Sequence, residues 1–181
     1  MMTHYVDLSP NGVGLTFELY GRVLKAAHLS HEKDSSITVD WPMWRDEPGA
    51  FGPIIRLLGP QAAIERCLSR LAALIDAGLI RPRCDVSEVP ATALYAHGYR
   101  RSRKPDKGSP SYVRRLQRRA QARGEPFDGV TPPWIKATHS VVMQSTTNEQ
   151  QFHVYIERVA AAALASCRPN RYAMGVPVPS F

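Results

Sequence analysis

The residues between positions 100 and 123 carry the excess positive charge of this 181-residue chain. They include ten lysines and arginines and one acidic residue, Asp106, which gives a charge of +9 against +7 for the whole chain. The other residues are close to neutral, with 13 basic and 15 acidic side chains. Positive charge concentrated in one segment indicates that an anionic partner binds there.

The middle of this basic segment is predicted to form a helix over residues 109–123. Ser109 is suited to the N-cap and Pro110 to the first helical position. We expect the helix to reach about Ala122, because Gly124 and Pro126 follow and both residue types end helices.

The predicted helix has one apolar edge and one arginine side. The apolar side chains, which fall within about 100° of one another, are Tyr112, Val113, Leu116 and Ala120. The opposite side carries Arg114, Arg115, Arg118 and Arg119. Arginines at i, i+4 repel one another, and the helix contains no acidic residue that would offset this. Such an unmixed set indicates an external polyanion, with a merely solvated charged face as the alternative.

An RNA hairpin is the expected form of that polyanion. Guanidinium groups bind phosphates and guanine edges in bidentate fashion. The major groove of a regular RNA duplex is too narrow for side chains, but it opens near a loop or a helix end. A short stem-loop therefore suits the arginine side, while duplex DNA stays an alternative.

Composition argues against several other classes of protein. Cys67, Cys84 and Cys167 are widely spaced without a CxxC pair, so we expect free thiols and neither a disulfide framework nor a cysteine zinc site. His28 and His31 have no further ligands at metal spacing, so neither a metal site nor a cofactor is expected. The sequence shows no apolar run long enough for a bilayer and no signal peptide, which predicts a cytoplasmic protein without membrane contact.

The hydrophobic pattern predicts an α+β fold that begins with a ferredoxin-like domain over residues 1–99. Strands are expected at residues 3–8, 36–41, 53–58, 84–89 and 93–99. Helices are expected at residues 15–30 and 61–77, where apolar residues recur at helical spacing. The order strand, helix, strand, strand, helix, strand is that of the split βαβ unit, an antiparallel sheet with two helices on one face.

The second region, residues 100–181, is predicted to be an RNA-binding arm. It begins with the basic loop RRSRKPDKGSP and the arginine helix, followed by a linker at residues 124–133. Residues 139–145 and 152–159 are expected to form a β-hairpin around the turn TTNEQ. The last segment, RYAMGVPVPSF, is expected to be a strand that returns to the body of the protein.

Several segments together resemble the type I-F CRISPR repeat-processing endoribonuclease family. They are YRRSRKPDKGSPSYVRRLQRRAQARGEPF, QSTTNEQQFHVYIER and RYAMGVPVPSF, and the earlier run GRVLKAAHLSHEKDSSITVDWP also fits. The resemblance spans nearly the whole chain. It implies a ferredoxin-like domain followed by an arm with an arginine-rich helix.

The resemblance implies a metal-independent endoribonuclease that acts on CRISPR repeat RNA. Such enzymes bind the repeat stem-loop and cleave at the 3′ base of the stem by 2′-hydroxyl attack, which leaves a 2′,3′-cyclic phosphate and a 5′-hydroxyl. They stay on the mature crRNA as a subunit of the RNA-guided surveillance complex. We expect the protein to be monomeric before that assembly.

The resemblance also assigns RNA contacts to individual residues. The arginine side of the helix corresponds to the part that lies in the major groove of the stem. Arg101 and Arg103, with Lys104 as a nearby alternative, correspond to positions that read base edges low in the stem. The family often has an arginine and a glutamine there, so two arginines imply a different base pair. Phe152 resembles the aromatic residue that stacks on the terminal base pair, although strand alternation alone fits a core position equally well.

Three residues are predicted to act at the cut. Ser145 resembles the serine that holds the ribose, and Tyr172 matches an aromatic residue near the active site. The histidine base of the family falls at Leu24 or Lys25 here, so we assign the base to His28, one turn along the helix. A neutral imidazole suits uptake of the 2′-hydroxyl proton near pH 7.

Alternatives remain for the base and for the function. Lys25 could act at the phosphate by stabilising developing charge, His31 lies a further turn along, and His28 could be an ordinary residue at a helix end. His139 and His153 fall on predicted strands and are expected to be sheet residues. The displaced histidine keeps open a catalytically inactive subunit that binds the stem-loop, and the basic charge keeps open a nucleic-acid-binding module unrelated to CRISPR.

Overall fold

The first sheet has the strand order of a ferredoxin-like domain. In the computed structural model, which describes residues 2–11, 16–32, 36–103, 110–129, 139–145, 149–164, 166 and 168–181, the elements are β1 (His4–Pro10), α1 (Thr16–Leu29), β2 (Thr38–Asp40), β3 (Ile55–Gly59), α2 (Gln61–Asp76) and β4 (Ile80–Pro82). The strands pair antiparallel in the order β2–β3–β1–β4. This is the arrangement of the split βαβ unit, so the predicted ferredoxin-like fold is confirmed.

The strand after α2 begins earlier than the sequence pattern predicts. Residues 84–89 are the predicted strand, but β4 starts at Ile80 and only the two-residue β5 (Ser87–Glu88) falls in the predicted range. Both pair with β1. Gly78 has a φ of 67° and ends α2, where its N–H donates to the Ile75 carbonyl. Because the turn at glycine is so tight, the chain enters the sheet almost at once.

The second sheet combines residues from the middle and the end of the chain. It contains β6 (Leu94–Ser102), β7 (His139–Gln144), β8 (Gln151–Ala160) and β9 (Pro177–Ser180), in the order β7–β8–β6–β9, and the short helix η2 (Ala161–Ala163) follows β8. The predicted β7–β8 hairpin and the returning C-terminal strand are both present. β6 extends three residues beyond the predicted end at Tyr99, as far as Ser102.

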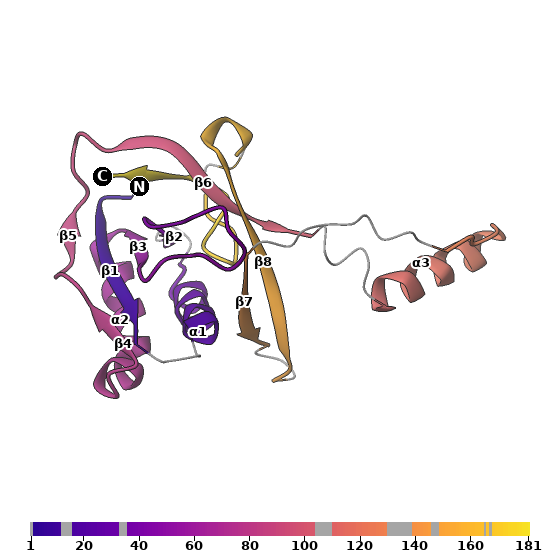
Figure 1. The fold of residues 1–181 in the computed structure, drawn as a ribbon, viewed down its shortest axis with the longest axis horizontal. Coiled ribbons are helices and arrows are strands. Elements are labelled where there is room, and N and C mark those ends of the chain that lie inside the picture. The colour runs from indigo at the N-terminus through magenta and orange to yellow at the C-terminus, as the bar shows by residue number, and fades with distance from the viewer. Residues whose placement is uncertain are drawn as a thin grey trace. The chain divides into compact units, whose positions relative to one another are not determined.

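The C-terminal strands group with the ferredoxin-like residues rather than with the arginine helix. Two compact units result: Met1–Arg101 with Thr138–Phe181, and Ser102–Ala137. The predicted division into residues 1–99 and 100–181 stays a prediction. Within the larger unit α1 packs on β7 (Figure 1), and a methyl group at Gly21 would overlap the carbonyl oxygen of Val142.

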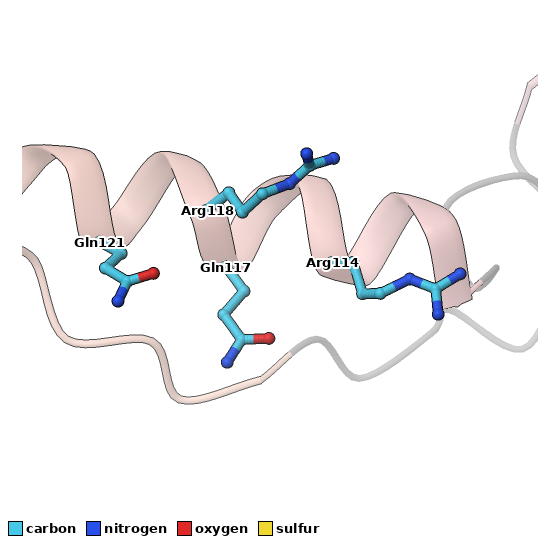
Figure 2. Close-up of a pocket in the computed structure, with 4 residues that line it drawn as sticks. All are labelled: Arg114, Gln117, Arg118 and Gln121. Atoms are coloured by element: carbon cyan, nitrogen blue, oxygen red, sulfur yellow. The ribbon is translucent and has the colours of Figure 1, made fainter.

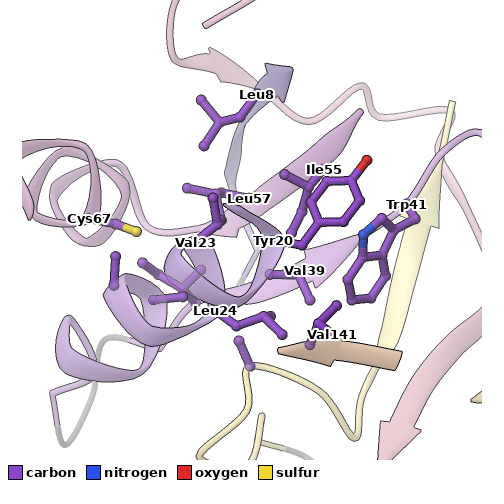
Figure 3. Packing of buried hydrophobic residues seen from close by; sticks show 14 of the residues in the cluster. Leu8, Tyr20, Val23, Leu24, Val39, Trp41, Ile55, Leu57, Cys67 and Val141 are labelled. Atoms are coloured by element: carbon purple, nitrogen blue, oxygen red, sulfur yellow. The ribbon is translucent and has the colours of Figure 1, made fainter. Parts of the chain in front are cut away.

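One hydrophobic core serves both sheets of the larger unit. Figure 3 shows Tyr20, Val23 and Leu24 of α1 among side chains of the first sheet, with Val141 of β7 close by. Trp41 is 1% exposed and packs edge-on against Tyr99, with ring centroids 4.9 Å apart. Because residues of both sheets belong to the same core, α1 and the β7–β8 hairpin are held in a fixed relation to each other.

The smaller unit contains the arginine helix, α3 (Pro110–Arg123). It begins at Pro110, as predicted, and runs one residue past the predicted end at Ala122. Gly124, with a φ of 67°, ends it, and the next N–H donates to the Ala120 carbonyl at 3.0 Å. The expected N-cap Ser109, most of the basic loop and the end of the linker lie outside the described residues.

Two further expectations concern cysteines and membranes. Cys67 and Cys84 are free, and burial raises the pKa of the Cys67 thiol to about 12, while Cys167 lies outside the described residues. Among the helices that the structure describes, none combines the length and the apolar character needed to cross a bilayer.

Candidate functional site

The predicted two sides of α3 are present in the structure. Tyr112, Val113 and Leu116 are half-buried and Ala120 is 6% exposed. The exposed side carries Arg114, Arg115, Arg118 and Arg119. In the described part of the chain, no carboxylate forms an ion pair with any of these four arginines, whereas Arg123 pairs with Glu125 at 3.0 Å. That the exposed arginines bind RNA stays a prediction.

A hollow on α3 adds two residues that sequence reasoning missed. It has a volume of about 620 Å³ and is lined by Arg114, Gln117, Arg118 and Gln121. Figure 2 shows Gln117 and Gln121 extending from the same side of the helix. Their spacing of i, i+4 was the available signal. A side-chain amide can donate to and accept from one base edge, and a guanidinium group can bind phosphate, so this side of α3 carries both kinds of group that contact with a nucleic acid would need.

Arg101 and Tyr172, which the sequence predicts for separate roles, are in contact. The Arg101 Nη1 donates to the Tyr172 hydroxyl at 2.7 Å, and the guanidinium carbon lies 5.1 Å from the centre of the tyrosine ring. Asn170 shapes the loop before Tyr172, because its Oδ1 accepts the Tyr172 N–H at 2.8 Å. Arg103 is exposed, and Lys104 lies outside the described residues.

A second hollow lies where α1 crosses the end of the β7–β8 hairpin. The residues that line it are Glu18, Gly21, Arg22 and Lys25 of α1, and Val142, Met143, Gln144 and Gln151 of the hairpin. Ser145 directly follows Gln144, and its N–H donates to the Gln150 carbonyl at 2.9 Å, closing the hairpin. The hollow is therefore next to a residue that was predicted to act at the cut.

Phe152 and Ser145 belong to the side of the hairpin that faces the core. Phe152 is opposite Met143 in the sheet and is half-buried against the core. Side chains alternate along a strand, so Ser145 shares its side with Val141 and Met143, both buried. Both predicted residues thus lie at the hairpin end near α1. The stacking role of Phe152 stays a prediction, because its burial also fits a core position.

Lys25 and His28 occupy different places along α1. Lys25 lines the hollow at the hairpin end, whereas His28 is not one of the described residues that line it. His28 is half-buried in the last helical turn, seven residues after Gly21 and so on the same side of the helix. Its Nδ1 is buried and has no hydrogen-bond partner among the described residues. The roles of both residues at the cut stay predictions.

His31, the third candidate for the base, has a structural contact. Its Nε2 lies 3.0 Å from the Ile37 carbonyl, to which only a protonated ring nitrogen can donate. Burial lowers the pKa of His31, the Ile37 carbonyl raises it, and the nearby His28 lowers it further. The His28 and His31 rings have centroids 6.4 Å apart. His31 therefore fixes the chain after α1.

A polar cluster between the two sheets also escaped sequence reasoning. The Tyr99 hydroxyl donates to the buried Asp40 at 3.0 Å, and the His97 Nε2 is 3.4 Å from the same oxygen. The Ser180 hydroxyl is 3.2 Å from the other ring nitrogen of His97. Burial, and then the charge of Asp40, raise the pKa of Tyr99. The cluster ties β2 to β6 and β9, and no local sequence signal marks residues so far apart.

The two histidines predicted to be sheet residues, His139 and His153, both lie on strands. His139 on β7 stacks on Trp44 with ring centroids 3.6 Å apart, and burial lowers its pKa. His153 on β8 is exposed. Across the described residues, no group of three or more His, Cys, Asp or Glu side chains is placed to hold a metal ion.

Comparison with protein families shows the family of this chain. A family model described as "CRISPR-associated protein (Cas_Csy4)" matches residues 9–181, from the end of β1 through α3 to the C-terminal strands. A search of curated proteins found no match. The resemblance seen in the sequence is thus confirmed over nearly the full length, and the chain belongs to the Cas_Csy4 family, the type I-F CRISPR-associated endoribonucleases that process crRNA.

Proposed function

We propose that this protein binds the stem-loop of a CRISPR repeat, cleaves it without a metal at the 3′ base of the stem, and remains on the product. The observation that carries the proposal is the family match over residues 9–181. The exposed arginine side of α3 and the grouping of α1 with the end of the β7–β8 hairpin supply the two surfaces that such an enzyme needs.

The stem is bound by α3. Its four exposed arginines form two rows along the helix, and each guanidinium group can contact phosphates on either side of a widened major groove. Gln117 and Gln121 lie beside these arginines on α3 and can read base edges. Most of these contacts are with phosphates of the stem. Because the cut leaves the stem unchanged, the same contacts hold the product, and the enzyme remains bound to it.

Cleavage takes place where α1 crosses the end of the β7–β8 hairpin. His28 takes the proton of the 2′-hydroxyl before the scissile bond, and the freed oxygen attacks the adjacent phosphorus. The 5′-oxygen of the next nucleotide leaves and takes up a proton, so the products are a 2′,3′-cyclic phosphate and a 5′-hydroxyl. Lys25 stabilises the charge that develops on the phosphate, and Ser145 holds the attacking ribose.

Tyr172 and Arg101 are proposed to act together. The Arg101 guanidinium group is held by the Tyr172 hydroxyl at 2.7 Å, which fixes the direction in which its other N–H groups point. Arg101 contacts a base or a phosphate low in the stem, while Phe152 stacks on the terminal base pair. Tyr172 then acts by positioning Arg101.

The test uses a labelled repeat hairpin incubated with the protein in EDTA. We expect a 5′-hydroxyl product and a cyclic phosphate. His28→Ala should reduce single-turnover cleavage by about 10²–10⁴-fold while hairpin affinity is kept, because a general base contributes about that much. Unchanged cleavage in His28→Ala would eliminate His28 as the base. The dependence of the cleavage rate on pH distinguishes the base from the charge-stabilising residue. Loss of the base removes the rise in rate with increasing pH, whereas Lys25→Ala should lower the rate at every pH and keep that rise.

Other outcomes would favour other functions. Tight binding to an intact hairpin in all conditions would indicate a catalytically inactive stem-loop subunit. Equal competition by duplex DNA would indicate a nucleic-acid-binding module without selectivity for the repeat. Membership of the surveillance complex is tested by copurification of the cleaved hairpin and protein with the other subunits, and a product that dissociates before assembly would contradict it.

A further inference from the structure

A groove between α1 and α2 contains three basic residues that the proposed stem contacts do not use. It has a volume of about 480 Å³ and is lined by Arg22, Lys25, Ala26 and Leu29 of α1 and by Arg70, Leu71 and Leu74 of α2. None of the described residues that line it is acidic. The apolar lining residues are Ala26, Leu29, Leu71 and Leu74, and Leu71, at 2% exposed, forms the floor. A basic rim over an apolar floor can bind an extended polyanion.

The groove adjoins the hollow at the hairpin end. Arg22 and Lys25 line both cavities. The two side chains therefore lie between the hollow, where the cut is proposed to occur, and the groove between α1 and α2. A strand that passes the scissile phosphate and continues along this junction enters the groove and reaches Arg70.

We propose that this groove binds the single-stranded RNA on the 3′ side of the cut, the part of the repeat that is released after cleavage. The inference rests on the proposed function, because it takes the cut to lie at the 3′ base of the stem. On the 5′ side of that phosphate the strand is paired in the stem, so only the 3′ flank is free to follow the groove. Lys25 neutralises the scissile phosphate, and Arg22 and Arg70 can each neutralise one phosphate of the flank, so an extended strand gains three phosphate contacts.

The groove offers charge rather than base recognition. No aromatic residue is among the described residues that line it, so it provides no platform for stacking bases. The 3′ flank should therefore bind with little sequence preference and with strong salt dependence. Each phosphate contact on a single strand contributes about −0.7 to the slope of log K against log salt concentration, so three contacts contribute about −2. A change from 50 to 200 mM salt then removes roughly 15–20-fold of the gain in affinity.

Binding measurements with RNA distinguish a 3′ RNA flank from an acidic protein helix as the occupant of the groove. An amphipathic helix in the same groove would leave the affinity for RNA independent of the flank. The experiment measures fluorescence anisotropy with a repeat hairpin that carries 2′-deoxy nucleotides at the 3′ base of its stem, so that no attacking hydroxyl is present. The hairpin is prepared without an extension, with a short 3′ oligouridine extension, and with the same extension on the 5′ side.

We expect the 3′ extension, and not the 5′ extension, to strengthen binding by about 20-fold at 50 mM salt and to lose most of that gain at 200 mM. Arg70→Gln should reduce the ratio of affinities with and without the 3′ extension and lower the salt slope of that ratio by about 0.7. Arg81→Gln is the matched control, because Arg81 is exposed on β4 and does not line the groove. It should keep the wild-type ratio.

Three results would overturn the inference. They are equal affinity with and without the 3′ extension, a gain from the 5′ extension instead, and a gain that Arg70→Gln leaves unchanged. In each case binding and cleavage of the hairpin itself still stand, so the proposed function survives. Failure of the protein to bind or cut any hairpin would remove both the proposed function and the inference.

Discussion

Replacing Gly21 by alanine tests whether the close approach of α1 and β7 builds the cleavage site. In an isolated helix this change stabilises by about 1 kcal/mol, because glycine is a poor helix former. Here the added methyl group would overlap the carbonyl oxygen of Val142 and lie 2.8 Å from its carbonyl carbon. Both atoms belong to the backbone of β7, which is paired with β8 along its length and cannot rotate away.

The cost of this overlap should exceed the gain in helix propensity. Overpacking a well-packed contact costs about 1–3 kcal/mol, and a rigid backbone places Gly21→Ala at the upper end. We expect a net loss of about 2 kcal/mol in the free energy of unfolding, measured by urea titration. Relief of the overlap moves α1 away from β7, and a displacement of about 1 Å between reacting groups can reduce a rate by about 10²-fold.

The effect of Gly21→Ala on the cleavage site is measured by two assays, with one control variant. Single-turnover cleavage of the repeat hairpin should fall by about 10²-fold, whereas hairpin affinity should change little, because α3 is untouched. Gly78→Ala is the matched control, since its φ of 67° strains an alanine by about 1–2 kcal/mol while nothing lies within 4 Å of the added methyl group. A Gly21→Ala protein with wild-type stability and cleavage would refute the reasoning.

The remaining predictions concern stability and RNA binding. Tyr99→Phe removes the donor to buried Asp40, so the free energy of unfolding should fall by about 1–3 kcal/mol in urea, and no fall would show that water replaces the hydroxyl. Burial lowers the pKa of His139 and of His31 in the folded state, so the unfolded chain binds more protons below about pH 6.5 and stability should decrease as the pH falls from 7 to 5. His139→Phe should reduce that decrease, which thermal unfolding at each pH would show, and an unchanged dependence would assign it elsewhere. Arg115→Gln should weaken hairpin binding and reduce the salt slope by about 1, and an unchanged slope would mean that Arg115 contacts no phosphate.

The sequence alone determined the elements whose residues lie close together in the chain. The order of strands and helices, the start of α3 at Pro110 and its exposed arginine side follow from periodicity, capping and charge over a few turns. The family resemblance was equally local, since it rests on contiguous segments. These features are set by interactions between neighbours, which a sequence displays directly.

The tertiary structure alone decided which distant elements share a unit. The hairpin was expected in the arm because it follows the arginine helix in the sequence, yet β7 packs on α1, more than one hundred residues earlier, through the absence of a side chain at Gly21. The contact of Arg101 with Tyr172 and the place of Lys25 in the hollow likewise join residues that are far apart in the sequence. A pattern of residue types records which side of an element is apolar, but the partner that covers that side is selected by shape and burial across the whole fold.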